Sequence, residues 1–396
     1  MWVEEFRDQY IHLELTDFCN YNCIMCCHDR PEGPHSGPSG FMSERLFRKI
    51  IDELPQVKAA TGLKLFWLGE PLLNPVFPDM LTYCARILRE KKSNYYIDIH
   101  TNAFLLDSRI SDLLLENGDV IPRITLSLDA HTQDTYRRIR RGGDIDRVRA
   151  NIKEFLIKRE KSGRISPTVI FQFIVMQENA DETGDFVKYW KDTVDSVRKG
   201  GFDILGKISK LSGYRNARKI QDHSGVNRPR DVIWLKRLDC EDVASAGKLY
   251  MDTVEKFSLE SGISKNLEII VSRFNLWNPE QEEERAREKE EQPQKRTICS
   301  GPFKTPSIRW DGTLTICCFD PSMELALGNL SDNTFEELWL GSRAHRIRSR
   351  FVNGEYSKVL THDGYQKCLN CPGLDTPFIS SDEIDQWKKE SGFERD

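Results

Sequence analysis

The sequence lacks the features of a membrane-spanning, secreted or strongly basic protein. No apolar run approaches the length that crosses a bilayer, and the first five residues are too acidic for a signal peptide. Positive charge is not in excess, because 57 Lys and Arg face 62 Asp and Glu, and the net charge of −5 gives no global attraction to nucleic acid. We therefore expect a cytoplasmic protein that binds neither membranes nor nucleic acids.

The cysteines do not form an even-numbered disulfide framework. There are eleven of them, arranged in clusters, which fits metal binding in a reducing compartment better than disulfide bonding. With 396 residues, of which 39% are hydrophobic, the chain is long enough for one large or two ordinary globular domains.

Cys19, Cys23 and Cys26 form a C-x3-C-x2-C triplet directly after a strand-like run at 11–16. Three thiolates on one tight loop can each bind one corner of a four-iron cube, which usually has four protein ligands. The fourth iron would then lack a local protein ligand and stay open to a substrate or cosubstrate. A zinc site or free thiols are the alternative, although zinc sites favour C-x2-C pairs.

Strand-like and helix-like segments alternate over the first half of the chain. Strands are predicted at 11–16, 63–68, 95–100, 123–128, 169–175 and 202–205, and helices at 44–54, 77–90, 108–116, 147–158 and 185–198. Ser43 and Asp107 are predicted N-caps, and Gly118 and Gly163 predicted helix stops. Repeated βα units predict an α/β fold with a parallel sheet, and six strands favour a partial (β/α)6 TIM-like barrel over a complete one.

The alternation stops after the last predicted strand. Residues 213–229 have the composition of a loop, 241–261 favour one helix, and 279–296 are almost wholly charged, as in a solvated helix or linker. We therefore predict three parts: a barrel at 1–208, an insertion and linker at 209–296, and a small cysteine-rich domain at 297–396.

Polar residues follow the predicted strands, at the ends where parallel barrels place their chemistry. Gly69 and Glu70 follow one strand, where a glycine lets backbone carbonyls approach an ammonium group and a carboxylate adds negative charge. An ordinary Gly-Glu-Pro turn is the alternative. Asn102 follows the next strand. Ser127 and Asp129 lie at the end of the strand after that, and either has the chemistry to hydrogen-bond a ligand.

A second group of cysteines lies near the C-terminus. Alternating residues flank a central Asp-Gly pair, a strong hairpin signal, and the hairpin would return Cys317 towards Cys299. Cys368 and Cys371 add a C-x2-C pair, so four thiolates are available for a second cluster without an open iron. Zinc is the alternative here, because it also suits four cysteines in this arrangement.

Together these motifs resemble the radical S-adenosylmethionine (SAM) superfamily, with a C-terminal auxiliary domain of twitch or SPASM type. The resemblance rests on the three-cysteine spacing, on Leu68-Gly69-Glu70-Pro71, on Thr101-Asn102-Ala103 and on the second cysteine group. It implies that Cys19, Cys23 and Cys26 hold a [4Fe-4S] cluster whose open iron chelates SAM. One auxiliary [4Fe-4S] cluster is implied at Cys299, Cys317, Cys368 and Cys371, where the choice of Cys317 over Cys318 rests on family spacing alone.

The resemblance also implies residues that contact SAM. The Gly-Glu pair would lie at its ammonium group, Asn102 at its ribose or methionine, and Ser127 or Asp129 within hydrogen-bonding reach. Arg140 matches the family arginine aimed at the SAM carboxylate, as a bidentate pairing. Met25 replaces the usual aromatic residue, and it can still pack near the adenine.

A family member would cleave SAM reductively and use a 5′-deoxyadenosyl radical to abstract hydrogen, with an electron from an external donor of flavodoxin or ferredoxin type. Only about ten residues precede the first strand, so we expect no leader-binding domain and a small-molecule substrate resembling a sugar or aminocyclitol. The auxiliary cluster would accept an electron, making the reaction a net oxidation, or act as a relay or structural element.

Two other functions stay open at this point. One is a peptide- or protein-modifying maturase, and the other is a non-catalytic iron–sulfur or zinc-binding protein. Substrate-contacting residues are not identified by any motif. Tyr214, Arg215, Trp234 and Lys236 are candidates by position, and Cys240 and Cys318 are thiols that have the chemistry of a hydrogen donor.

Overall fold

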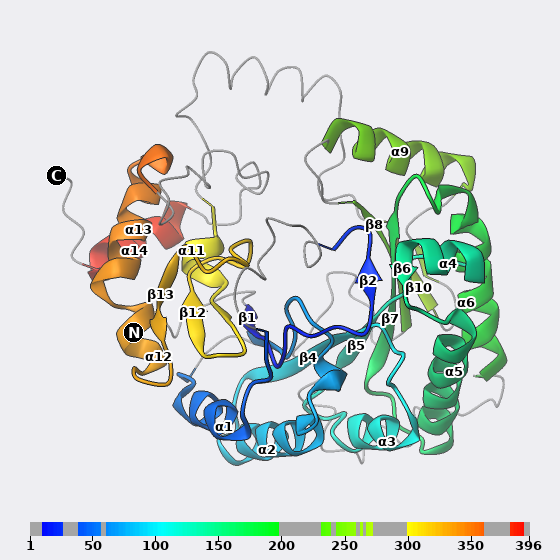
Figure 1. The fold of residues 1–396 in the computed structure, drawn as a ribbon, viewed down its shortest axis with the longest axis horizontal. Coiled ribbons are helices and arrows are strands. Elements are labelled where there is room, and N and C mark those ends of the chain that lie inside the picture. The colour runs from blue at the N-terminus through cyan, green and yellow to red at the C-terminus, as the bar shows by residue number, and fades with distance from the viewer. Residues whose placement is uncertain are drawn as a thin grey trace.

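The computed structural model describes residues 10–26, 39–56, 61–197, 231–238, 243–258, 262–263, 267–271, 299–359 and 381–391. Within these ranges the central element is a curved, mainly parallel sheet (Figure 1). Its parallel strands are β1 (Tyr10–Leu13), β3 (Thr61–Lys64), β4 (Tyr95–Thr101), β5 (Arg123–Ser127), β7 (Thr168–Val175), β8 (Asp231–Arg237) and β10 (Leu267–Val271). They pair in this order, and β9 (Gly262–Ile263) joins β10 in antiparallel orientation.

Helices cover the outer side of the sheet (Figure 1). They are α1 (Glu44–Glu53), α2 (Phe77–Glu90), α3 (Ser108–Glu116), α4 (Gln133–Ile139), α5 (Ile145–Lys161), α6 (Thr183–Val197) and α9 (Val243–Lys256). Ser43 and Asp107 cap α1 and α3 as predicted, accepting hydrogen bonds from Leu46 N and Ile110 N. The predicted α/β partial barrel is therefore confirmed.

Alternating side chains divide each strand between two environments, because successive residues of a strand point to opposite faces. Leu63, Ile97, Ile124, Val169 and Ile233 are fully buried, forming part of the hydrophobic core. The residues between them on the same strands are mostly polar or only half-buried. The sheet therefore has an apolar outer face and a polar inner face, and the inner face is what the barrel encloses.

One sequence-based expectation about 209–278 was wrong. That stretch was predicted to hold a single helix, but β8 and β10 lie in it and extend the sheet beyond β7. The strand pattern of β8 is short in the sequence, because the charged residues Asp231, Lys236 and Arg237 flank an apolar run of only 232–235. The predicted helix at 241–261 corresponds to α9, and the predicted strand at 202–205 lies outside the described residues.

The C-terminal part continues the same sheet on its other side. It contains α11 (Gly301–Lys304), β11 (Ser307–Ile308), β12 (Thr313–Thr315), β13 (Ala326–Asn329), α12 (Phe335–Trp339), α13 (Ser342–Val352) and α14 (Ser381–Ser391). Strand β11 pairs in parallel with β1, and β11 and β12 form the predicted hairpin, with Gly312 at φ +89° in its turn. The hairpin that leads to Cys317 is thereby fixed beside the first strand of the barrel.

Candidate functional site

The three cysteines of the first motif lie on a short loop after β1. Strand β2 (Asn22–Cys23) of this loop pairs with β6 (Arg140–Arg141), with Cys23 opposite Arg140. The N–H of Cys26 donates to the carbonyl of Cys23 at 3.0 Å, which forms a tight turn between the two cysteines. The N–H of Tyr21 donates to the sulfur of Cys19 at 3.5 Å. The loop is therefore held by its own backbone and by the β2–β6 pair.

Arg140 and Asp129 form a buried ion pair next to this loop. Arg140 Nη2 donates to Asp129 Oδ2, its Nε donates to the carbonyl of Leu128 at 3.1 Å, and its Nη1 lies 3.6 Å from the sulfur of Cys23. The second oxygen of Asp129 accepts the N–H of Ile174 at 2.7 Å, and Asp129 is 0% exposed. Both residues were predicted as separate SAM contacts, whereas the structure pairs them with each other and aims the arginine at a cysteine.

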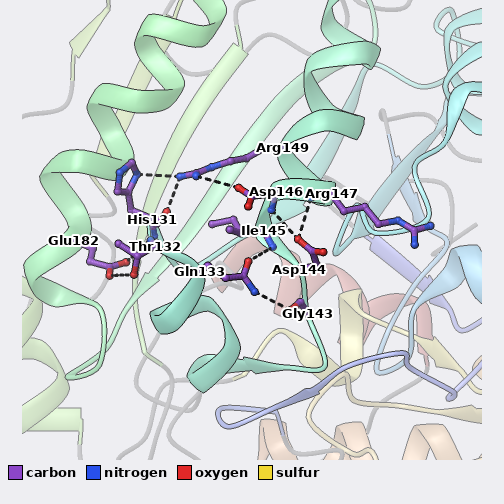
Figure 2. Close-up of polar contacts among 10 residues, drawn as sticks. All are labelled: His131, Thr132, Gln133, Gly143, Asp144, Ile145, Asp146, Arg147, Arg149 and Glu182. Carbon is purple, nitrogen blue, oxygen red and sulfur yellow. Dashed lines mark hydrogen bonds and ion pairs between the residues drawn. The ribbon is translucent and has the colours of Figure 1, made fainter.

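The turn that follows β6 is tied to the start of α4 and to the first turn of α5 (Figure 2). Gln133 at the start of α4 donates to the carbonyl of Gly143 at 3.4 Å and accepts the N–H of Ile145 at 2.8 Å. Asp144 accepts hydrogen bonds from two N–H groups in the first turn of α5. Strand β6 is thus held between two capped helices, which limits the positions that Arg140 can adopt.

Gly69 lies against the backbone just before the first cysteine. A Cβ at this position would come within 2.2 Å of the carbonyl of Thr16 and 2.6 Å of that of Phe18. Only a glycine permits this close approach. The N–H of the next residue, Glu70, donates to the carbonyl of Phe18 at 2.9 Å. The glycine was predicted to admit an ammonium group, and the structure shows it packed on the cysteine loop.

The Glu70 carboxylate is buried and accepts three hydrogen bonds. They come from Thr101 Oγ1 at 2.7 Å, Asn102 N at 2.8 Å and Leu72 N at 3.2 Å. Burial raises the pKa of Glu70 to about 7, although these hydrogen bonds oppose the rise. Glu70 therefore joins the ends of β3 and β4.

Asn102 also reaches the cysteine loop. Its Nδ2 donates to Asn20 Oδ1 at 2.9 Å, and its Oδ1 accepts the N–H of Phe104 at 3.0 Å. Ala103, where the family has glycine, has a left-handed φ of +62°. A non-glycine residue there costs about 1 kcal/mol. Ala103 therefore adopts the turn conformation of the glycine that it replaces, at the cost of backbone strain.

The two remaining predicted SAM contacts are more exposed. Ser127, the last residue of β5, and Met25, beside the third cysteine, are both half-buried. Met25 packs against the hydrophobic core. The two side chains therefore come from different elements, the end of the sheet and the cysteine loop, as the sequence predicted.

The donors of the cysteine loop suit an iron–sulfur cluster. Its three cysteines form no disulfide bonds, and burial raises the pKa of Cys19 to about 12 and also that of Cys23. Metal binding removes such protons outright. Donors to the sulfurs, here Tyr21 N–H and Arg140, are a usual feature of protein clusters, and Asn20 Nδ2 is a buried donor with no partner in the described structure. The described residues include no group of three His, Cys, Asp or Glu that would hold a single metal ion, so the fit rests on the donors.

The second cysteine group is partly described. The sulfurs of Cys299 and Cys317 lie 3.4 and 3.7 Å from the Cβ position of Gly301, so the hairpin brings them together as predicted from the sequence. Each accepts a backbone N–H at 3.3 Å, from Gly301 and Phe319 respectively. The expected partners Cys368 and Cys371 lie outside the described residues, as does Cys240.

Cys318 links this group to the barrel. Trp67, in the loop after β3, donates its Nε1 to the carbonyl of Cys318 at 3.0 Å. The choice between Cys317 and Cys318 as ligand stays a prediction. The pKa of Cys318 is lowered to about 7. The largest cause is the adjacent Cys317 thiol, and a hydrogen bond with Thr305 and the charge of Lys64 lower it further.

The sequence analysis missed most of the polar inner face of the barrel. Lys64, Asp98, His100 and Arg123 lie on three adjacent strands of the sheet, and none of them belongs to a motif. Two positional candidates, Trp234 and Lys236, share this polar face, with the Lys236 ammonium 4.8 Å from the Trp234 ring. A signal was present, because each residue alternates with apolar ones along its strand. Tyr214 and Arg215 lie outside the described residues.

Comparison with known families identifies the class. Residues 13–189 match the Radical SAM superfamily, and residues 299–372 match the iron-sulfur cluster-binding domain named SPASM. The chain therefore belongs to the radical SAM superfamily and carries a SPASM-type auxiliary domain. Its cofactors are a SAM-binding [4Fe-4S] cluster, an auxiliary iron–sulfur cluster and SAM. No helix in the described ranges is long and apolar enough to span a bilayer.

Individual relatives match parts of the chain. A GTP 3′,8-cyclase of Clostridium botulinum is 32% identical over 210 residues, which are 51% of this chain and 59% of that protein. A tungsten-containing aldehyde ferredoxin oxidoreductase cofactor-modifying protein of Pyrococcus furiosus is 26% identical over 185 residues, 46% of this chain and 48% of the relative. The chain thus spans about half the length of these curated relatives.

Solved structures share the fold along almost the whole chain. Native anSMEcpe with bound AdoMet has a TM-score of 0.52 at 15% identity, covering 96% of this chain and 96% of the other. Streptococcus suis SuiB bound to S-adenosylmethionine has a TM-score of 0.52 at 14% identity, covering 93% of this chain and 71% of SuiB. At such identities the likeness shows a common fold and leaves the substrate open.

Proposed function

We propose that this protein cleaves SAM reductively and abstracts a hydrogen atom from a small-molecule substrate. One observation carries the proposal: three separate motifs, at Gly69, Asn102 and Arg140, each contact the cysteine loop directly. Gly69 and Asn102 follow β3 and β4, which are parallel and end at the same edge of the sheet, whereas Arg140 reaches the loop through the antiparallel β2–β6 pair. Such convergence is expected of a cofactor site and is not needed for folding alone.

Each residue has a distinct part in this site. We propose Cys19, Cys23 and Cys26 as the ligands of a cluster that supplies the electron for SAM cleavage. Asp129 is then a positioning residue, because it holds Arg140 against the sulfur of Cys23 and has no free carboxylate oxygen. Arg140 places a positive charge beside that sulfur, where the carboxylate of a chelated SAM molecule would also lie.

The other predicted SAM contacts fall into two groups. Gly69 and Glu70 hold the backbone just before the first cysteine, and Asn102 holds Asn20 by a hydrogen bond. Ser127 and Met25 are less enclosed by their neighbours, and we propose that they contact SAM directly.

A small molecule is the substrate class that we propose, either sugar-like or aminocyclitol-like as expected from the sequence. It is supported by several relatives named as GTP 3′,8-cyclases, since GTP is a small molecule. The polar inner face of the barrel suits such a ligand as well. A peptide substrate is the competing outcome, and deuterium transfer from a labelled peptide into 5′-deoxyadenosine would establish it.

We further propose that the auxiliary cluster accepts an electron from the substrate, so that the reaction is a net oxidation. The support is that Cys318, next to the proposed ligand Cys317, accepts a hydrogen bond through its carbonyl from Trp67 in the loop after β3. Cys299→Ser would then stop product formation but leave SAM cleavage unchanged. Equal loss of both activities would indicate a structural role.

The external electron donor would need a docking surface near the first cluster. Exposed Arg137, Arg141 and Arg147, together with Phe104 and Asp144, line a surface hollow. Arg141 neighbours Arg140, whose partner strand carries Cys23. We propose that an acidic flavodoxin- or ferredoxin-type protein binds there. Arg141→Glu and Arg147→Glu should then slow reduction of the first cluster by the donor protein and leave its reduction by dithionite unchanged.

Anaerobic reconstitution followed by product analysis tests the main proposal. With dithionite and SAM, the intact protein should form 5′-deoxyadenosine and methionine. Cys23→Ala should abolish both, because one iron loses its protein ligand. Cys84→Ala is the matched control, since Cys84 is a buried free cysteine on α2 outside the motif. A wild-type protein that holds its clusters and never cleaves SAM would refute the proposal.

A further inference from the structure

A row of charged and polar side chains crosses the inner face of the barrel. His12, Lys64, Asp98 and Arg123 occupy equivalent positions on β1, β3, β4 and β5, because each is the register partner of the next. Residues in register on neighbouring strands lie side by side on one face. The four side chains therefore form one continuous band, here called the inner row.

Contacts within the inner row leave positive charge in excess. Asp98 is 1% exposed and accepts a hydrogen bond from Arg123 Nη2 at 3.4 Å, with His100 Nε2 at 3.8 Å from its other oxygen. The ammonium of Lys64 lies 3.7 Å from the centre of the Tyr10 ring. The single carboxylate of Asp98 is thus accompanied by two basic side chains, Arg123 and Lys64.

Two neighbouring groups reduce this excess, because burial lowers the pKa of Lys64 and the nearby Cys318 thiol has a pKa of about 7, but the remaining titratable groups do not. Burial lowers the pKa of His100 to about 3, and it lowers that of His12 as well, so both imidazoles are neutral. Glu14, further along β1, has its pKa raised by burial to about 8 and is largely protonated at neutral pH. Lys236 adds a third cation, close enough that its charge also lowers the pKa of His100.

An unsatisfied donor points to a missing anion. Arg123 Nε is buried and has no hydrogen-bond partner in the described structure. A buried donor without a partner costs roughly 1–3 kcal/mol. Arginine offers its donors in a planar fork that matches two oxygens of a carboxylate or phosphate. An anionic ligand would both accept a hydrogen bond from Arg123 Nε and neutralise the surplus positive charge of the inner row.

The layers above the inner row suit the rest of such a ligand. The Phe66 and His100 rings are stacked 3.8 Å apart, and they form an aromatic layer. Ser127 pairs in register with Gln172, and Gln172 with Trp234, to form a polar layer nearer the cysteine loop. Four residues of strand separate Arg123 from Ser127, or about 13 Å.

We propose that the barrel binds a small-molecule substrate by an anionic group, a phosphate or a carboxylate, held at Lys64 and Arg123. The reacting carbon then lies about 13 Å away, at the Ser127 layer beside the SAM site. This inference rests on the proposed function and adds the chemical class of the substrate. It favours an anionic molecule over a cationic aminocyclitol, because the inner row carries surplus positive charge.

Calorimetric titration of the anaerobically reconstituted full chain tests the inference, with pyrophosphate and malonate as the two probes. One of them should bind, and the stronger binder identifies the anion as phosphate-like or carboxylate-like. Arg123→Gln and Lys64→Gln should each weaken that binding at least tenfold. Arg86→Gln should leave it unchanged, since Arg86 is an exposed arginine on α2 that pairs with Glu90.

A third variant covers the case in which the inner-row changes unfold the chain. Lys236→Gln alters a half-buried side chain at the end of β8, and it should weaken binding several-fold while the melting temperature is kept. The inference fails if neither probe binds, or if all three variants bind as the wild type does. SAM cleavage by the wild type is measured in the same preparation, so that failure of the proposed function is recognised separately.

Discussion

At the scale of single residues, the buried pair of Arg140 and Asp129 is the most informative contact. It joins β5, β6 and the cysteine loop, and it is shielded from water on all sides. A buried charge that loses its partner is strongly destabilising, whereas an exposed pair contributes little. The pair therefore has a structural role as well as the proposed role at the cluster.

Asp129→Asn should lower the free energy of unfolding by about 3 kcal/mol or more, because it leaves the guanidinium of Arg140 without its counter-charge. Urea titration of the anaerobic protein measures this change. Asp119→Asn is the matched control, since Asp119 pairs with Arg89 at the surface and its loss should cost about 1 kcal/mol or less. Similar costs for the two variants would contradict the proposed role of Asp129.

Glu14 should make stability depend on pH. Its folded-state pKa of about 8 lies above the unfolded value near 4.5, mainly because of burial. The folded state therefore binds more protons between these values, and stability should fall as pH rises from about 5 to 8. Glu14→Gln should flatten this part of the curve of melting temperature against pH. An unchanged slope would show that Glu14 titrates normally.

At the scale of elements, a buried salt bridge explains how β8 joins the sheet. Arg159 of α5 forms two hydrogen bonds with Asp231 at the start of β8, of 2.7 and 2.6 Å. The same carboxylate accepts the N–H of Val169 on β7 at 2.8 Å. One side chain thus ties a helix to two neighbouring strands.

Asp231→Ala should destabilise the chain by roughly 3–5 kcal/mol, because the buried Arg159 loses its two hydrogen bonds to a carboxylate and keeps only the more distant Glu160, at 3.8 Å, as a counter-charge. Replacing Arg159 by Met in the same chain should restore part of the loss, because the buried charge is removed. Thermal and urea unfolding of both variants measure the effect. A double variant that is as unstable as the single one would contradict this explanation.

The sequence predicted the elements that depend on local pattern. Helices with clear caps at Ser43 and Asp107 and strands with apolar runs were found where expected. Strand β8 was missed because its charged residues are satisfied by partners far along the chain, as Asp231 is by Arg159. Such long-range compensation leaves no trace in a local window.

The candidate site shows the same division. The cysteine spacing and the motifs after the strands are local signals, and the structure brings them to one edge of the sheet. The pairing of Asp129 with Arg140 and the packing of Gly69 on Phe18 depend on how distant loops meet. The inner row was missed for that reason too, because its members come from four strands and share no motif.

At the scale of the whole molecule, the sheet connects the two cysteine groups. Strand β1 leads to the first group and pairs with β11, which lies in the domain that carries the second. Lys64, on the polar inner face of the barrel, is close enough to Cys318 to lower the pKa of that thiol. The proposed electron transfer to the auxiliary cluster depends on this contact.

Iron and sulfide counting on the anaerobically reconstituted full chain tests the central claim most directly. The wild type should hold about eight irons, and replacing Cys19, Cys23 and Cys26 together by alanine should leave about four and abolish 5′-deoxyadenosine formation. A triple variant that keeps its full iron content, or that still cleaves SAM, would show that these cysteines do not hold the catalytic cluster.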